Sequence, residues 1–109
     1  MARERPAPPC PDLVRRPVRG FGWLDARILH EGWLSRLGPD ATATLAFLAL
    51  AADERGASFY GRARMAAILG LDPHALHRAL ARLLALGLIA HRPWRPGHPD
   101  GVWQILPVP

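Results

Sequence analysis

Apolar residues recur at helical spacing along most of the chain, and glycine or proline interrupts each run. In the range 21–37 the pattern predicts a short first helix, which Gly32 ends in a turn. A longer helix is predicted over about residues 38–54, because Pro39 suits a first helical position and Asp40 suits the positive end of the helix dipole. The apolar positions of the first helix are Leu24, Ile28 and Leu29.

The longer of these two helices is apolar on two sides. One interpretation is a central helix that the rest of the domain buries, and the other is a seam shared with a second copy of the chain, giving a homodimer through the first helices. The pattern favours the central helix. One apolar stripe consists of Ala41, Leu45, Leu48 and Ala52, and the other of Ala43, Phe47 and Leu50.

The middle of the chain predicts a strand and two further helices. Residues 58–60 have the composition of one short strand, and a helix is expected over about residues 62–69, with Gly70 as a left-handed cap. Asp72 is a suitable N-cap and a proline follows it, so the next helix is predicted over about residues 73–86.

The last part of the chain predicts a β-hairpin. Two short apolar runs, at about residues 88–90 and 102–106, read as strands on either side of a stiff loop. Trp94 and Trp103 are expected to face each other across these strands. The residues that stiffen or turn the loop are Pro93, Pro96, Gly97, Pro99 and Gly101.

Residues 1–20 predict a flexible arm, so the folded domain is expected to span residues 21–109. Five prolines block regular structure in the arm, and most of its other residues are arginine or small. Such an arm either lies along DNA, on phosphates or in a minor groove, or is a solvated tail. Its cations are Arg3, Arg5, Arg15, Arg16 and Arg19.

Composition narrows the functional classes. The chain of 109 residues carries a formal charge of +5, and its fourteen cations are all arginine, which indicates a polyanionic partner and first of all nucleic acid. Cys10 is the only cysteine, so an internal disulfide and a cysteine-based zinc site are excluded and a reducing cytoplasm is the expected location. The longest apolar run, residues 41–52, is too short to span a membrane.

The two helices around Gly70 resemble a helix-turn-helix unit. Ala66 lies four residues before that glycine, where only a small side chain lets the helices cross closely. Ala79 departs from the pattern, because a larger aliphatic residue is usual there. The segment 80–89, LARLLALGLI, resembles the passage from recognition helix to wing hairpin in winged-helix regulators of the MarR and GntR types. The positions that such units bury between their helices are occupied by Met65, Leu69, Leu71 and Leu76.

This resemblance extends over about residues 21–109. It implies a winged helix-turn-helix fold, mainly α with a small β-hairpin, and binding to double-stranded DNA, without naming a target. The segments FGWLDARILHEGWLSRL, ADERGASFY and WQILPVP also look like small helix-turn-helix proteins encoded beside transposons and on plasmids. The expected roles are therefore transcription regulation or an accessory role in a mobile or replicating element.

The helix at 73–86 is the expected reader of DNA. At 100° per residue its leucines share one buried face, and the outward face is small and cationic. Arg78 is placed to bind a guanine edge and Arg82 a phosphate. The resemblance implies that contacts concentrate in the first turns, at His74, Ala75, His77 and Arg78. The plainer alternative is that these residues only solvate a surface helix.

Cations outside this helix complete the predicted interface. Arg62 and Arg64 on the preceding helix are placed to touch the DNA backbone. Arg92, Arg95 and His98 lie on or near the hairpin loop, from which a wing reaches a minor groove or a neighbouring phosphate.

Other functions are weighed against DNA binding. A winged helix that binds an acidic protein instead of DNA is the first alternative, and RNA binding with tryptophan stacking is the second. Catalysis is not expected, because the chain has no paired-carboxylate, nucleophile-elbow or phosphate-loop motif. His74 and His77 have ligand-like spacing without supporting ligands, so no metal or other cofactor is expected. No pocket for an effector is marked in the sequence.

Overall fold

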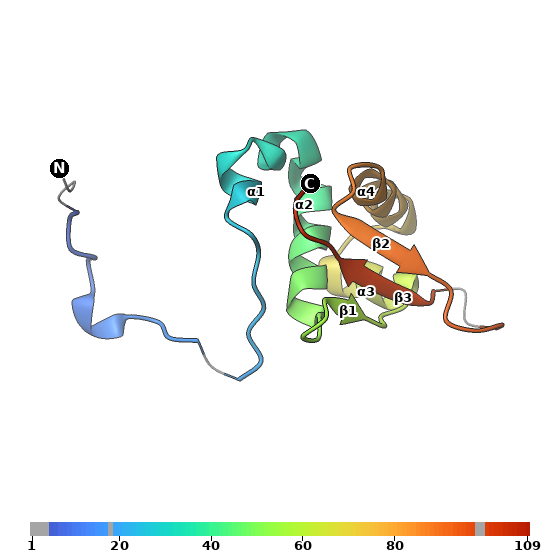
Figure 1. The fold of residues 1–109 in the computed structure, drawn as a ribbon, viewed down its shortest axis with the longest axis horizontal. Coiled ribbons are helices and arrows are strands. Elements are labelled where there is room, and N and C mark those ends of the chain that lie inside the picture. The colour runs from blue at the N-terminus through green and yellow to red at the C-terminus, as the bar shows by residue number, and fades with distance from the viewer. Residues whose placement is uncertain (1–4, 18, 98–99) are drawn as a thin grey trace.

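The structure is a computed structural model, which describes residues 5–17, 19–97 and 100–109. Helices and a small sheet form the body, and the N-terminal residues extend away from it (Figure 1). In these residues the helices are α1 (Arg27–His30), α2 (Trp33–Ala51), α3 (Arg62–Leu69) and α4 (Pro73–Ala85), and the strands are β1 (Ala57–Ser58), β2 (Ile89–Arg92) and β3 (Val102–Ile105).

The first helix is shorter than the sequence pattern predicts, and the second begins earlier. α1 is a single turn, and α2 starts directly after Gly32, whose positive φ of 77° reverses the chain. The predicted start near residue 38 corresponds to a break inside α2, where Gly38 has φ 77° and ψ 173° and Pro39 restarts the helix. The piece before the break stays helical because Trp33 and Leu37 are buried in the core.

The end of α2 is a correction to the predicted boundary near residue 54. Ala52 is extended, and the carboxylate of Asp53 then accepts hydrogen bonds from the backbone N–H groups of Arg55 and Ala57, at 2.8 and 3.0 Å. These bonds turn the chain into β1 and hold the pKa of the Asp53 carboxyl below its usual value. A local side-chain turn therefore ends the helix earlier than apolar periodicity indicates.

The sheet has three strands in the order β1-β3-β2, all antiparallel. The predicted pairing of Trp94 with Trp103 is wrong: the residue opposite Trp103 is His91, and Trp94 lies beyond the end of β2. Trp103 is buried, while 56% of Trp94 is exposed and its ring lies 6.2 Å from that of Phe59. The pairing register decides this, because β2 ends two residues before Trp94.

The core lies between α2, α4 and the sheet. Leu45 of α2, Leu83 of α4, Met65 of α3 and Trp103 of β3 are each at most 2% exposed. The first predicted stripe of α2 faces this core at Ala41, Leu45 and Leu48, whereas Leu50 of the second stripe is 69% exposed. α2 is thus the central helix, and part of its second side faces solvent.

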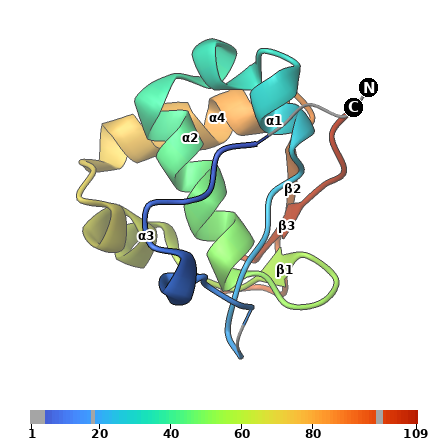
Figure 2. The same cartoon turned by 90° about the vertical axis from the view of Figure 1, so that its left-hand side faces the viewer.

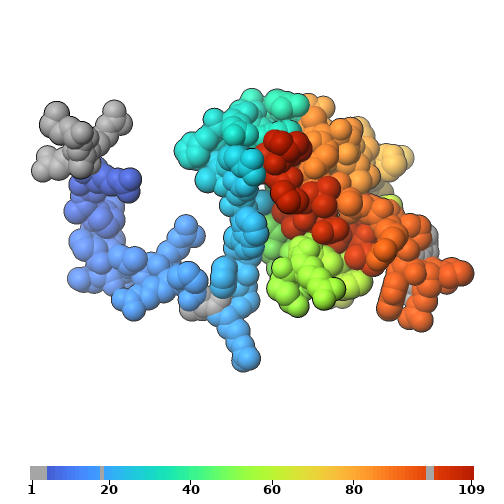
Figure 3. Space-filling view, viewed as in Figure 1, coloured from blue at the N-terminus to red at the C-terminus, as the bar shows by residue number. Residues whose placement is uncertain are grey.

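Residues 5–17 are exposed throughout and lie apart from the body (Figures 1 and 3). In the view turned by 90° they pass in front of it (Figure 2). Within them Pro11–Leu13 form one 3₁₀ turn. The molecule measures 56 × 30 × 25 Å, with the arm contributing to the long dimension. In the part of the chain that is described, no helix combines the length and apolarity needed to cross a membrane.

Candidate nucleic-acid interface

The α3–turn–α4 unit has the local geometry that its sequence predicts. Gly70 adopts a left-handed conformation with φ 69°, and the N–H of Leu71 donates to the carbonyl of Ala66 at 3.0 Å. Asp72 caps α4, because its carboxylate accepts from the N–H of Ala75 at 2.9 Å. This bond is the main cause that lowers the pKa of the Asp72 carboxyl. A backbone hydrogen bond therefore fixes one end of the turn, and a side-chain cap fixes the other.

The buried side of α4 is also as predicted. Leu76, Leu80 and Leu83 are each at most 3% exposed, and Ala66 of α3 is buried where the two helices approach. Ala79, the departure from the helix-turn-helix pattern, is buried as well, with Leu80 beside it in the core. The helix is held against the body along its whole apolar side, so its outward side chains have a defined orientation.

The outward side of α4 presents most of the residues predicted to read DNA. His74, His77 and Arg78 are exposed, and so are the small residues Ala81 and Ala85. Ala75 is a correction: it is only 7% exposed, because it lies one turn before the buried Ala79 on the inward side of α4, and its side chain is therefore not part of the outward surface. The first turns of α4 thus offer two imidazoles and one guanidinium.

Arg82 has a partner within the protein, which the sequence did not indicate. Its Nε donates to the carbonyl oxygen of Arg36 at 2.7 Å, and its Nη2 donates to the same oxygen. The break at Gly38 and the missing N–H of Pro39 interrupt the hydrogen bonds of α2 near this carbonyl. Arg82 therefore joins α4 to the break in α2, and its predicted contact with a DNA phosphate stays a prediction.

Arg62 also has a structural role, at the junction of α3 and the hairpin. The carboxylate of Asp100 accepts from the Arg62 backbone N–H at 3.1 Å and from its Nη1 at 2.9 Å. Asp100 thereby caps α3 from the hairpin loop, and these bonds, the backbone one first, lower the pKa of its carboxyl. The Arg62 guanidinium lies over the ring of Trp103, 4.9 Å from its centroid. The hairpin is thus attached to the α3–turn–α4 unit.

His91 strengthens the same junction from β2. Its Nε2 lies 2.6 Å from the carbonyl oxygen of Asp100, and its ring packs on that of Trp103 with centroids 4.0 Å apart. Sequence reasoning missed both Asp100 and His91, because their partners are contributed by other strands or helices. The two residues hold the hairpin loop at a fixed place beside α3.

The remaining predicted cations lie on aromatic rings or at the hairpin. The guanidinium of Arg64 is 5.1 Å from the centroid of Tyr60, and that of Arg95 is 4.2 Å from the centroid of Trp94. Arg92 is exposed at the end of β2. His98 lies outside the described residues. The space-filling view places α4 and the hairpin together at the end of the body away from the arm (Figure 3).

Acidic and basic residues are segregated along the chain. Residues 56–109 contain six arginines and two acids, and both acids, Asp72 and Asp100, cap helices. Residues 21–55 contain three arginines and five acids. We define the cationic face as the exposed cations of α3, α4 and the hairpin other than Arg82, whose guanidinium binds the Arg36 carbonyl: Arg64, His74, His77, Arg78, Arg92 and Arg95.

Comparison of the chain with family models, with curated proteins and with solved structures found no match. In the described ranges, no three histidine, cysteine, aspartate or glutamate side chains gather in a way that would hold a metal ion.

Proposed function

We propose that this protein binds double-stranded DNA through α4 and the hairpin, as a winged helix-turn-helix protein that recognises a sequence. The observation that carries the proposal is the outward side of α4, where His74, His77 and Arg78 stand on a helix whose other side is fixed in the core. In residues 56–109 both acids, Asp72 and Asp100, cap helices, so the electrostatic field at the exposed surface of this segment is positive.

The dimensions and side chains of α4 suit a major groove. Thirteen residues give a helix about 20 Å long, and Ala81 and Ala85 keep its outward side narrow enough to approach base edges. Arg78 binds a guanine edge in a bidentate manner, and the hairpin arginines Arg92 and Arg95 neutralise phosphates beside it. Because Arg82 is engaged with α2, base reading is assigned to the first two turns of the helix.

In the cell, such binding serves a transcriptional regulator or an accessory protein of a mobile or replicating element. Selection of binding sites from random duplexes tests the proposal directly, because it measures binding and specificity together. Enrichment of one duplex motif supports it. A preference for single strands assigns the protein to RNA or single-strand binding, and an absence of salt-dependent nucleic-acid binding assigns the cationic face to an acidic protein partner.

Arg78→Ala is the sharpest variant for this proposal. It is expected to weaken binding to the selected site and to relax discrimination at one base pair by about 1–3 kcal/mol, because a guanine-reading arginine supplies both. Arg55→Ala is the matched control, since it removes the same charge from the exposed surface of the acidic segment. Equal losses on selected and random DNA would contradict base reading by Arg78.

The hairpin has a different expected signature. Arg92→Ala combined with Arg95→Ala is expected to weaken binding to all duplexes alike and to flatten the dependence on log salt concentration by about one unit for each phosphate that the hairpin no longer neutralises. Specificity should survive. An unchanged salt slope, in DNA that the parent protein binds, would show that the hairpin does not touch the backbone.

A further inference from the structure

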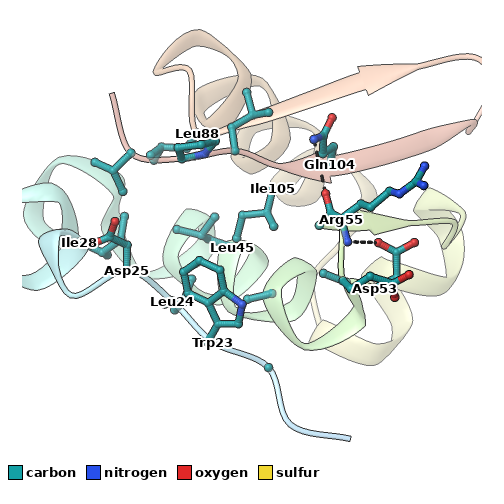
Figure 4. A pocket seen from close by; sticks show the side chains of 18 of the residues that line it. Trp23, Leu24, Asp25, Ile28, Leu45, Asp53, Arg55, Leu88, Gln104 and Ile105 are labelled. Carbon is teal, nitrogen blue, oxygen red and sulfur yellow. Dashed lines mark hydrogen bonds between the residues drawn. The ribbon is translucent and has the colours of Figure 1, made fainter.

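A groove of about 720 Å³ lies on the body away from the cationic face. Its walls are the extended residues 21–25, the core side of α2, and β3 with the residues that follow it (Figure 4). Leu45, Leu88 and Ile105 form its apolar floor, and Trp23 and Leu24 stand along one wall. The sequence marked no pocket, because these walls come from three distant parts of the chain.

Large apolar side chains are exposed around this groove. Phe21 and Trp23 are 63% and 75% exposed, and the neighbouring Leu50 of α2 is 69% exposed. Gly22 lies so close to α2 that a Cβ built there would be 2.6 Å from the carbonyl oxygen of Ala49, which places this wall directly against the helix. Exposed apolar side chains gathered at a groove are typical of a binding site.

The polar residues of the groove are predominantly acidic. Asp25, Asp53 and Glu54 line it together with a single cation, Arg55. Asp25 is already paired with Arg27 at 2.8 Å, and Asp53 holds the turn after α2. Among the described residues that line the groove, Glu54 is thus the acid without a partner in its own chain. In a chain with a formal charge of +5, this acidic edge favours an occupant that is both apolar and cationic.

The N-terminal arm has this chemistry. Leu13 and Val14 are 77% and 64% exposed at the end of the 3₁₀ turn, and Arg15, Arg16 and Arg19 follow them. The arm does not cover the groove of its own chain but lies apart from the body (Figures 1 and 3). A turn at Gly20, with φ 83°, redirects the chain just before the groove wall begins.

We propose that the groove receives the arm of a second copy of this chain. Leu13 and Val14 of one copy lie on the apolar floor of the other, and Arg15 and Arg16 lie against Glu54. The eight residue-to-residue steps from Leu13 to Phe21 span up to about 28 Å when extended, enough to reach an adjacent body. Reciprocal exchange of the two arms gives a closed, two-fold dimer. Its formation does not depend on DNA binding.

The test is the molar mass of the full chain without DNA, by light scattering or sedimentation over a range of concentrations. The parent protein is expected to dimerise. Leu13→Asp with Val14→Asp is expected to raise the dimer dissociation constant by about tenfold or more, because it places charges in an apolar site. Ile68→Asp is the matched control, since Ile68 is an exposed apolar residue of α3 outside the groove, and it should leave the dimer intact.

Charge reversal tests the pairing itself. Glu54→Arg alone, and Arg15→Glu with Arg16→Glu alone, are each expected to weaken the dimer, and the three substitutions together are expected to restore it. A parent protein that stays monomeric, or a dimer that neither arm nor groove variants change, overturns the proposal. Leu13→Asp with Val14→Asp and Glu54→Arg leave α4, the hairpin and every arginine in place. Binding of these two variants to a duplex short enough for one copy of the chain therefore separates failure of the dimer from failure of DNA recognition.

Discussion

The α4 face and the groove opposite it are built on one core but expose opposite chemistry. On α4 Leu76, Leu80 and Leu83 point inward and the cations outward, so the exposed surface carries positive charge. Around the groove Phe21, Trp23 and Leu50 point outward, and the charged residues beside them are mostly acids. The first surface suits a polyanion, and the second suits an apolar, cationic segment.

The difference follows from where the backbone hydrogen bonds of each region are made and from which groups its acidic side chains bind. Asp72 and Asp100 cap α4 and α3, so the carboxylates of the C-terminal half are used within the fold. The extended residues 21–25 form no helix that could turn their apolar side chains inward, and Gly22 holds them close to the end of α2. β3 is common to both regions, with Trp103 under the hairpin junction and Ile105 in the groove floor.

The largest expected effect comes from the strand that the two regions share. Trp103→Ala should lower the free energy of unfolding by about 3–5 kcal/mol, because it removes a fully buried ring from the core. Urea denaturation measures the loss, and Trp103→Phe should cost less because much of the volume is kept. DNA affinity and dimerisation are expected to fall together in Trp103→Ala; loss of only one would mean that β3 does not couple the regions.

An intermediate effect is expected from Gly22→Ala, which disturbs the groove alone. The added Cβ would lie 2.6 Å from the Ala49 carbonyl oxygen and 2.8 Å from Leu50 Cα, so residues 21–24 must move away from α2. Overpacking of this kind costs about 1–3 kcal/mol. The rate of amide hydrogen exchange at the end of α2 should rise, and the dimer should weaken. The affinity of a single copy of the chain for a short duplex should stay unchanged. A loss of that affinity would contradict the separation of the two regions.

The smallest effect is expected where the hairpin caps α3. Asp100→Ala should cost about 0.5–1 kcal/mol, the lower part of the range for N-caps, because solvent screens a carboxylate that is 44% exposed. Folding lowers the pKa of the Asp100 carboxyl. Its contribution to the free energy of unfolding is therefore fully present above the pKa of the unfolded chain, and it is lost as the pH falls through the lower pKa of the folded protein.

The measurement for this cap is the melting temperature of the parent and of Asp100→Ala between pH 7 and pH 2. The difference between the two proteins should narrow below about pH 4, as the parent carboxylate becomes protonated. A difference that is constant across this range would assign the effect of Asp100 to packing instead of charge.

Local signals in the sequence were sufficient for the α3–turn–α4 unit. Gly70 supplies the left-handed cap, and Asp72 followed by Pro73 supplies the start of α4, each through bonds within a few residues. The predicted helix at 62–69 coincides with α3, and the three predicted inward leucines of α4 are buried. The outward positions of His74 and Arg78 follow from the same periodicity.

Partners far apart in the sequence were decided by the tertiary structure alone. Arg82 binds a carbonyl 46 residues away, and Asp100 caps a helix that begins 38 residues earlier. The strand register places His91 opposite Trp103. The groove combines residues from both ends of the domain. Periodicity and capping report only on neighbours within a turn or two, whereas these contacts depend on how the finished elements pack.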